Sequence, residues 1–245
     1  MQAAHSLNLK KVMNKVLNTE QLSTVNCQLS TIMIQLQTKL PTDTWVTATW
    51  EEYIQTVEDP VYAKAKGYYY NGQMRIETMG VGPNHASDNG IVYLAVSLFG
   101  IVKNIAIQGL INCSYRKPGV RESQPDISYY IGARAKLAPR CSSIANLNTI
   151  APPDLAIEIA DTSLSDDLGQ KRLLYEDLEI PEYWVVDVEN TRILAFQIAS
   201  SGSRRITESQ VLPGLSIAVL IEALEMSRTM DQSEVGSWLL AQFQK

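Results

Sequence analysis

Apolar and polar positions follow regular periods along most of the chain from about residue 45 onward. Five short β-prone runs, separated by Gly, Pro and Asn, predict strands within 109–117, 125–132, 154–160, 182–188 and 191–199. Residues 84–104 are apolar on most sides between Ile91 and Val102, which predicts a helix buried against a sheet. Apolar spacing further predicts a helix between the third and fourth strands and two closing helices at 217–227 and 235–243.

Two local signals add to this pattern. Thr49 stands three residues before Glu52, the spacing of a reciprocal capping box, and predicts a helix start. Asn71 and Gly72 separate two β-prone runs within 67–80, which predicts a tight hairpin. The order hairpin, helix, three strands, helix, two strands favours an α/β fold with one mixed sheet flanked by helices over a regular βαβ repeat.

The composition changes along the chain and predicts three parts. Residues 1–40 are rich in Gln, Asn, Ser and Thr and form a polar N-terminal extension. Residues 41–225 contain the predicted strands and helices of the α/β domain. Residues 226–245 are expected to form a C-terminal helix packed on that domain.

Charge and cysteine content exclude several classes of protein. The 245 residues are 45% hydrophobic, enough for a full core, and the net charge of -5 gives no overall attraction to nucleic acid, so DNA contact must come from a local patch. The three cysteines lack zinc-site spacing and are too few for a disulfide framework. Without a signal-peptide core or a long apolar run, we expect a cytoplasmic protein that does not enter membranes.

Two carboxylates interrupt the strand predicted at 154–160. Asp154 and Glu158 share one strand face with small alanines, while the opposite face is apolar. Four residues separate them by about 13 Å, too far to share one ion. Asp126, on the strand predicted at 125–132, is the better partner for Glu158, because acids on adjacent strands are spaced to share Mg²⁺. An exposed face with solvated acids explains this strand equally well.

Lys171 interrupts an apolar helix stripe. Leu168, Leu174, Tyr175 and Leu178 occupy about a third of the helix circumference, with Lys171 in the middle. A lysine in that position either extends past the core edge into solvent or points at a negative group. Because the helix follows the strand that carries Glu158, the second interpretation gains weight.

Several of these segments together resemble a known family. The runs "YYYNGQMRIETMGVGPNHASDNG", "PDISYYIG" and "PPDLAIEIADTSLSDDLGQKRLLYEDLEIPEYWVVDVENTRILAF" are similar to the Uma-two family of restriction endonuclease-like proteins, which is abundant in cyanobacteria. The resemblance extends from about residue 45 to about 225. It implies the PD-(D/E)XK nuclease fold, a mixed sheet flanked by helices, which agrees with the order of elements above.

The resemblance also implies roles for individual residues. Asp126 corresponds to the Asp of the first motif and Glu158 to the acid of the second. The lysine usual two residues after that acid is replaced by Ala160, and its role passes to Lys171. The resemblance implies an endonuclease that hydrolyses DNA phosphodiester bonds with Mg²⁺ or Mn²⁺, held by Asp126, Glu158 and the backbone carbonyl of Ile159, and compatible with a homodimer.

Other features weaken or extend this assignment. Tyr68 stands where relatives often carry a glutamate, so a third acid would have to come from elsewhere; the candidates, each equally explained as a surface acid, are Glu77, Asp88 and Glu122. His85 begins the buried helix, where we expect a packing role. The alternative to an enzyme is therefore a catalytically degenerate nuclease-fold module that binds nucleic acid or a protein partner.

Charged residues elsewhere have simpler explanations or remain open. Asp166 and Asp167 begin a helix, where acids complement the helix dipole. One basic cluster near a site strand could follow a phosphate backbone, and a solvated loop explains it equally well; it consists of Tyr115, Arg116, Lys117 and Arg121.

Overall fold

The strands and helices predicted between residues 45 and 245 are present, with additional short strands between them. The computed structural model of the chain describes residues 40–78, 80–200 and 202–245, so the predicted polar extension lies outside the described residues except for Leu40. The helices are α3 (Trp50–Val57), α4 (Pro83–Val102), α5 (Leu164–Leu168), α6 (Gln170–Asp177), α7 (Ile217–Met226) and α8 (Gln232–Phe243), with 3₁₀ helices η1 (Pro60–Tyr62) and η2 (Gly132–Leu137).

The strands fall into two six-stranded mixed sheets rather than the single sheet predicted. The hairpin sheet has the order β1-β3-β2-β6-β5-β8 and the central sheet the order β12-β11-β10-β9-β7-β4. Their bounds are β1 (Trp45–Thr47), β2 (Lys66–Tyr70), β3 (Gln73–Glu77), β4 (Ile107–Ile111), β5 (Tyr115–Lys117), β6 (Arg121–Ser123), β7 (Ile127–Ile131), β8 (Ala145–Asn146), β9 (Leu155–Ala160), β10 (Glu182–Asp187), β11 (Arg192–Ala199) and β12 (Gly202–Ile206).

The run predicted as one strand at 109–117 explains the second sheet. Asn112 interrupts it with a φ of 52°, in the left-handed region that Asn tolerates better than most residues. The chain turns there, so β4 joins the central sheet and β5 joins the hairpin sheet. The β-prone composition predicted strand residues on both sides of Asn112 but carried no signal for the change of sheet.

Both local signals of the N-terminal half are confirmed. The Thr49 side chain accepts from the Glu52 backbone N–H at 3.2 Å, and the Glu52 side chain accepts from the Thr49 N–H at 2.8 Å, a complete capping box. Asn71 and Gly72 both have positive φ, 50° and 71°, as a two-residue hairpin turn requires. Strands β2 and β3 are thereby paired antiparallel with Tyr68 opposite Arg75 and Lys66 opposite Glu77.

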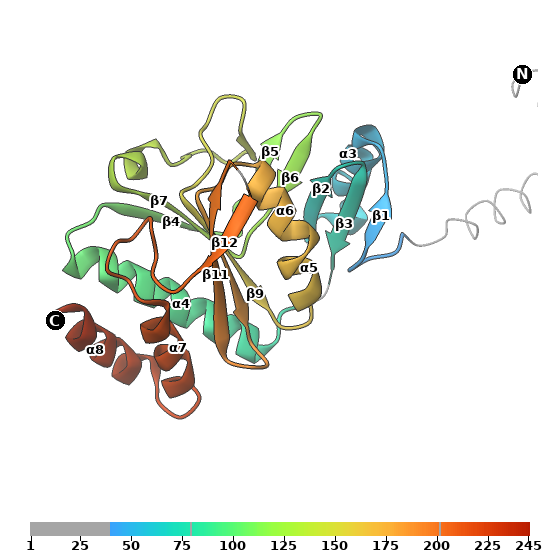
Figure 1. Ribbon diagram of the computed structural model, residues 1–245. Coiled ribbons are helices and arrows are strands. Elements are labelled where there is room, and N and C mark those ends of the chain that lie inside the picture. Colours follow the sequence, from blue (N-terminus) through green and yellow to red (C-terminus); the bar gives the residue numbers. More distant parts are fainter. Residues whose placement is uncertain (1–39, 79, 201) are drawn as a thin grey trace, which may run out of the picture. The chain divides into compact units, whose positions relative to one another are not determined.

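The central sheet is covered on both faces. Figure 1 shows α4, α7 and α8 together on one side of it and α5 and α6 on the other. Helix α4 is the one helix among the described residues that is long and apolar enough to cross a membrane by length and composition alone. Its buried side chains, including Ile91, Val96 and Phe99, pack in the core that the sheet shares with α7 and α8, so it is a core helix, as predicted.

The helix predicted between β9 and β10 is divided in two. Gly169 ends α5 and begins α6 with a φ of -99° and a ψ of -107°, outside the helical region. A Cβ at this position would lie 2.8 Å from the Ser165 carbonyl oxygen, so only glycine fits. The predicted apolar stripe survives the break, because Lys171, Leu174 and Tyr175 are buried.

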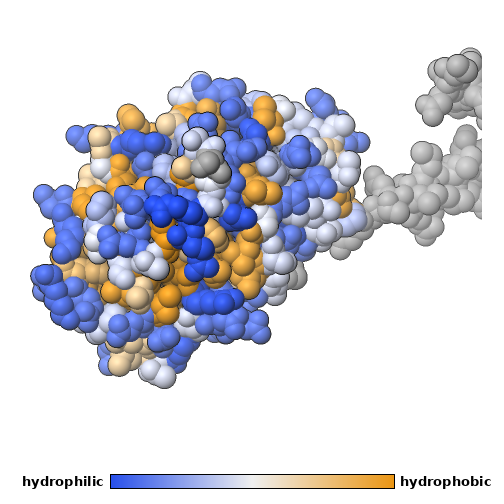
Figure 2. Space-filling view, in the orientation of Figure 1, coloured by the Kyte–Doolittle hydropathy of each residue, from blue (hydrophilic) through white to orange (hydrophobic). Residues whose placement is uncertain are grey.

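The edge strand β12 of the central sheet carries exposed charged side chains. Figure 2 shows strongly hydrophilic side chains over β12, one edge strand, where Arg204 and Arg205 are exposed. Charged side chains on an edge strand discourage pairing with another sheet. Taken together, the two mixed sheets and their flanking helices form an α/β fold, which is the predicted class.

Candidate functional site

Asp126, the residue before β7, lies opposite Glu158 on β9 when the register of these two strands is extended by one residue. Strands β7 and β9 pair antiparallel with Ile127 opposite Ile157, and the same register places Asp126 opposite Glu158. Residues directly opposite on one sheet face have Cβ atoms about 4.5–5.5 Å apart. Both residues are buried, 3% and 2% exposed, and the structure therefore brings together the two acids that strand alternation paired.

A cavity of about 690 Å³ opens above this pair. Asp126, Glu158, Ile159 and Lys171 all line it, so every residue proposed from the sequence for the site faces one cavity. The rest of the charged lining comes from the loop before β1, the hairpin sheet and the loop and helix after β9; it comprises Asp43, Lys64, Lys66, Arg75, Glu77, Asp161 and Asp166. Six carboxylates thus face four cationic side chains, an excess of negative charge.

Two phenols hold one oxygen of Glu158. Tyr175 on α6 donates a hydrogen bond to Glu158 Oε1 at 2.7 Å, and Tyr68 on β2 donates to the same oxygen at 3.1 Å. Among the described residues, no hydrogen bond reaches Glu158 Oε2. Burial raises the pKa of Glu158, and its interaction with Lys171 opposes but does not cancel that effect. The two phenols fix the orientation of the Glu158 carboxylate through Oε1, and Oε2 is still available to a ligand.

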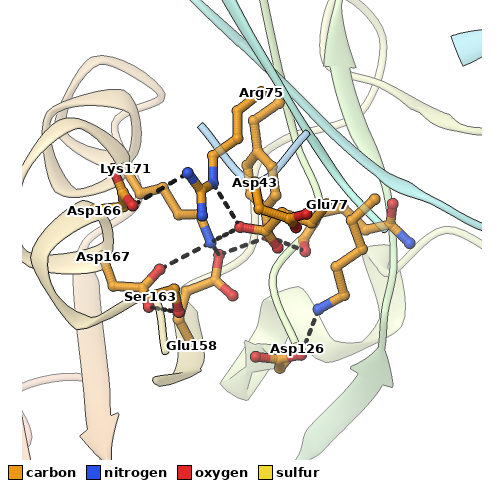
Figure 3. Close-up of polar contacts among 12 residues, drawn as sticks. Asp43, Arg75, Glu77, Asp126, Glu158, Ser163, Asp166, Asp167 and Lys171 are labelled. Atoms are coloured by element: carbon orange, nitrogen blue, oxygen red, sulfur yellow. Dashed lines mark hydrogen bonds and ion pairs between the residues drawn. The ribbon is translucent and has the colours of Figure 1, made fainter. Parts of the chain in front are cut away.

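The Lys171 ammonium is surrounded by carboxylates. It lies 2.8 Å from Glu77 Oε1, 2.8 Å from Asp167 Oδ1 and 3.8 Å from Glu158 Oε1. Figure 3 shows these side chains converging from β3, β9, α5 and α6. Burial alone would lower the pKa of Lys171, but Asp167, Glu158 and Glu77 together raise it above its ordinary value. We call Glu77, Glu158, Asp167 and Lys171 the lysine cluster; its lysine is held in the charged form.

Asp126 is held by a different set of groups. Its Oδ2 accepts a 2.8 Å hydrogen bond from the Ile159 backbone N–H, and its Oδ1 accepts one from the Lys66 ammonium. His85 Nε2 lies 3.4 Å from the same Oδ1. Burial raises the pKa of Asp126, but His85 and Lys66 lower it by more, so the carboxylate is ionised. His85 therefore begins α4 as predicted, yet its side chain contacts the site.

Asp154, the residue before β9, contacts a different set of groups. Asp154 Oδ2 accepts a hydrogen bond from the Ile131 N–H at 2.7 Å, and Arg134 Nε lies 3.2 Å from Asp154 Oδ1. Asp154 does not line the cavity. All six residues of β9 are buried, so the interpretation of this strand as an exposed face with solvated acids is wrong. Helix α6 and the hairpin sheet cover the face of β9 that carries Ala156, Glu158 and Ala160.

The basic cluster predicted from the sequence is not a free cationic patch. Tyr115 is fully buried and its hydroxyl is hydrogen-bonded with Ser128 at 2.7 Å. Arg116 is paired with Glu122, and Arg121 is paired with Asp177 at 2.6 Å. Neighbouring acids neutralise two of the three basic residues, which the spacing along the chain could not reveal.

The three candidates for a third acid are now distinguished. Asp88 is buried and forms a two-point ion pair with Arg228 at 2.5 and 2.8 Å, and Glu122 is paired with Arg116. Only Glu77 lines the cavity, where it contacts Lys171. Interaction with Lys171 and Arg75 lowers the pKa of Glu77 despite its burial.

Several residues of the site were missed or assigned another role. Lys66 and Tyr175 had no proposed role, and Asp166 and Asp167 were assigned to the helix dipole. Asp166 Oδ2 lies 3.1 Å from Arg75 Nη1, while Asp167 binds Lys171 one helical turn away. The i, i+4 spacing of Asp167 and Lys171 is typical of an ion pair on a helix and could have indicated their contact. Lys66 and Tyr68 share a strand face, but only the packing of that face against β9 brings their side chains to Asp126 and Glu158.

The donor set at Asp126 and Glu158 fits a magnesium-like ion with few protein ligands. Within the described ranges, no three His, Cys, Asp or Glu side chains are grouped so that they could hold a metal. Two carboxylates and a backbone carbonyl suit Mg²⁺, which keeps several waters. Both backbone groups of a strand residue point to the same strand edge, so the Ile159 carbonyl faces the edge where its N–H meets Asp126.

Comparisons with known proteins found one family model and a solved structure of low identity. A solved structure described as a "putative nuclease belonging to DUF820" from Anabaena variabilis has 18% sequence identity and a TM-score of 0.49, over 72% of this chain and 98% of that chain. No curated protein matches the chain significantly. A family model, Uma2, described as "Putative restriction endonuclease", matches residues 50–231, well over half of the sequence. The chain therefore belongs to the Uma2 family.

Proposed function

We propose that the protein is a Mg²⁺- or Mn²⁺-dependent endonuclease that hydrolyses DNA phosphodiester bonds in the cavity above Asp126 and Glu158. The observation that carries the proposal is the convergence of these opposed acids with Lys171 on one cavity. Membership of a family described as restriction endonucleases supports DNA as the substrate.

The metal site would consist of Asp126, Glu158 and the Ile159 carbonyl. A bound divalent ion supplies a water of lowered pKa and neutralises charge on the phosphate. The excess of carboxylates over cations in the lining supports this assignment, because the cavity by itself repels a polyanion and attracts a cation.

The protein's own residues would position the Glu158 carboxylate and neutralise charge on the phosphate. Tyr68 and Tyr175 hold Glu158 Oε1, which leaves Oε2 toward the cavity. Lys171, fixed between Glu77 and Asp167, places a permanent positive charge beside Glu158 and on the wall that the phosphate would meet. Such preorganised charge is most effective in a site that excludes water.

A plasmid assay tests the proposal. Supercoiled DNA incubated with the full chain and Mn²⁺ or Mg²⁺ should convert to nicked and linear forms, and chelation should stop the conversion. Asp126→Asn should remove cleavage while leaving thermal unfolding cooperative, whereas Asp88→Asn, which alters a buried acid outside the cavity, should retain cleavage if it folds. Cleavage that persists in Asp126→Asn would contradict the proposal.

The second candidate is a nuclease-fold module that binds DNA without cutting it. Tyr68 favours it, because a phenol replaces the glutamate that the family resemblance leads one to expect, and so removes a possible metal ligand. Retention of DNA in a gel-shift assay, with no cleavage of plasmid, linear or single-stranded DNA in either metal, would establish this alternative.

Two active sites related by symmetry would cut both strands of a duplex in one binding event, so we also propose a homodimer. Light scattering of the full chain with and without a DNA duplex tests it. A monomer in both conditions that still linearises plasmid in one binding event would contradict it.

A further inference from the structure

Lys66 occupies the place next to Asp126 that a metal ion would need. It lies on β2, in the sheet that faces β9, and its ammonium donates to Asp126 Oδ1 while the other oxygen is bonded to the Ile159 N–H. Both oxygens of Asp126 are therefore engaged. The Lys66 side chain is 19% exposed and lines the cavity, so it is not locked in the core as Lys171 is.

Lys66 also lies within the field of the second acid. Tyr68, two residues further along the same face of β2, donates to Glu158 Oε1, and Lys66 and Glu158 both line the cavity. Burial lowers the pKa of Lys66, but Asp126 and then Glu158 raise it by more. A cation beside this pair of carboxylates is what a metal site would contain. The ammonium therefore has the charge and the position of a stand-in for the divalent ion.

A divalent ion and this ammonium are incompatible at Asp126. Mg²⁺ requires carboxylate oxygens at about 2.0–2.1 Å, so an ion on Asp126 Oδ1 would lie within a few ångströms of the Lys66 ammonium at its present position. Like charges at that separation repel strongly even in water. The flexible four-carbon stem of lysine allows the ammonium to move within the cavity, whereas the backbone N–H of Ile159 cannot leave.

We propose that Lys66 is an internal counter-ion of the metal site, which holds Asp126 when no divalent ion is bound and yields its place when one binds. The inference rests on the proposed function, since it assumes that Asp126 and Glu158 bind the ion. It makes Lys66 a positioning residue that lowers metal affinity and keeps Asp126 ordered in the absence of metal. Its displaced charge stays in the cavity.

Calorimetric titration of the full chain with Mg²⁺ and with Mn²⁺ tests the proposal. Lys66→Met should bind either ion at least about tenfold more tightly than the unmodified protein, because one repelling charge is removed. Lys66→Gln, which keeps a donor for Asp126 but no charge, should also bind more tightly. Lys64→Met, on the same cavity rim, removes a charge that does not contact Asp126 and should change the affinity much less.

Thermal unfolding gives a readout that is independent of activity. Lys66→Met should have a lower Tm than the unmodified protein without metal and a larger rise in Tm when metal is added, because the ion replaces a missing partner of Asp126. Equal or weaker metal binding by both Lys66 variants, with binding retained by the unmodified chain, would overturn the counter-ion inference alone. Absence of binding by every variant would overturn the proposed metal site itself.

Discussion

Asp154 directly precedes β9 and Glu158 lies within it, on the same face by strand alternation, yet their surroundings differ. Asp154 is satisfied by the Ile131 N–H and by Arg134, a cation whose side chain is 35% exposed, and it does not line the cavity above Asp126 and Glu158. Glu158 is 2% exposed, has one oxygen without a hydrogen bond from the described residues, and shares a buried lysine with two other acids.

The difference shows what separates a structural carboxylate from a candidate ligand. Burial alone does not, because both acids are buried. At Asp154 the available donors match the carboxylate. At Glu158 the protein supplies donors to one oxygen and a cavity to the other, and the neighbouring acids leave net negative charge, which is costly unless a cation compensates it.

Removing the cation beside Glu158 or the cation beside Asp154 should give the largest difference between the two acids, measured as a loss of stability. Lys171→Met leaves three carboxylates around one apolar side chain and should lower the free energy of unfolding by about 3–5 kcal/mol, or prevent folding. Arg134→Met should cost about 0–1 kcal/mol, since the pair is partly exposed. Urea unfolding measures both values.

A rescue variant keeps this comparison informative if Lys171→Met does not fold. Adding Asp167→Asn and Glu77→Gln removes two of the uncompensated charges and should restore part of the stability. If Lys171→Met alone unfolds no more easily than Arg134→Met, the lysine cluster does not stabilise the fold as described.

Neutralising each acid should separate function from structure. Glu158→Gln should weaken Mn²⁺ binding by more than about 100-fold, because loss of even an outer-shell partner costs 10–100-fold, and should abolish DNA cleavage. Asp154→Asn should leave both properties close to those of the unmodified protein. Calorimetry and the plasmid assay measure the two effects, and similar losses in both variants would remove the distinction between the two ends of the strand.

A smaller effect is expected from the phenol that holds Glu158. Tyr175→Phe removes the 2.7 Å hydrogen bond to Oε1 and should lower metal affinity by about tenfold. Tyr130→Phe is the control: it removes a 2.9 Å hydrogen bond to the Ala151 carbonyl outside the cavity. It should lower the free energy of unfolding by about 1 kcal/mol without changing metal affinity. Equal metal affinities in the two variants would exclude a positioning role for Tyr175.

The smallest expected effect is on the pH dependence of stability in the presence of chelator. Because the folded protein raises the pKa of Glu158, this group's stabilising contribution is full below the ordinary glutamate pKa and is lost as pH rises through the raised value. Glu158→Gln should therefore show a smaller loss of stability between mildly acidic and mildly alkaline pH. Glu189→Gln, at an exposed glutamate, should follow the unmodified protein; identical profiles for all three would contradict the raised pKa.

Local and periodic features were readable from the sequence because they depend on nearby residues. The capping box at Thr49, the Asn71–Gly72 turn and the two faces of β9 follow from backbone geometry at short range. Opposed acids at Asp126 and Glu158 followed from strand period and spacing, and Lys171 from helix period.

Contacts between distant segments were not readable, because no periodic signal states which faces meet. The hairpin that carries Lys66, Tyr68 and Glu77 packs against β9 and α6 only in the tertiary fold. The pairing of Arg116 with Glu122 neutralises part of a basic cluster that the spacing left open as either a phosphate-binding patch or a solvated loop.

The sequence by itself determined the type and approximate place of most elements, the alternation of side chains between their faces, and the chemical types available for a site, since these depend on propensity and period. The tertiary structure alone decided which charges are compensated and which carboxylate oxygen remains open to a cavity. Electrostatic balance depends on distances between segments that are far apart in the chain, and only packing sets those distances.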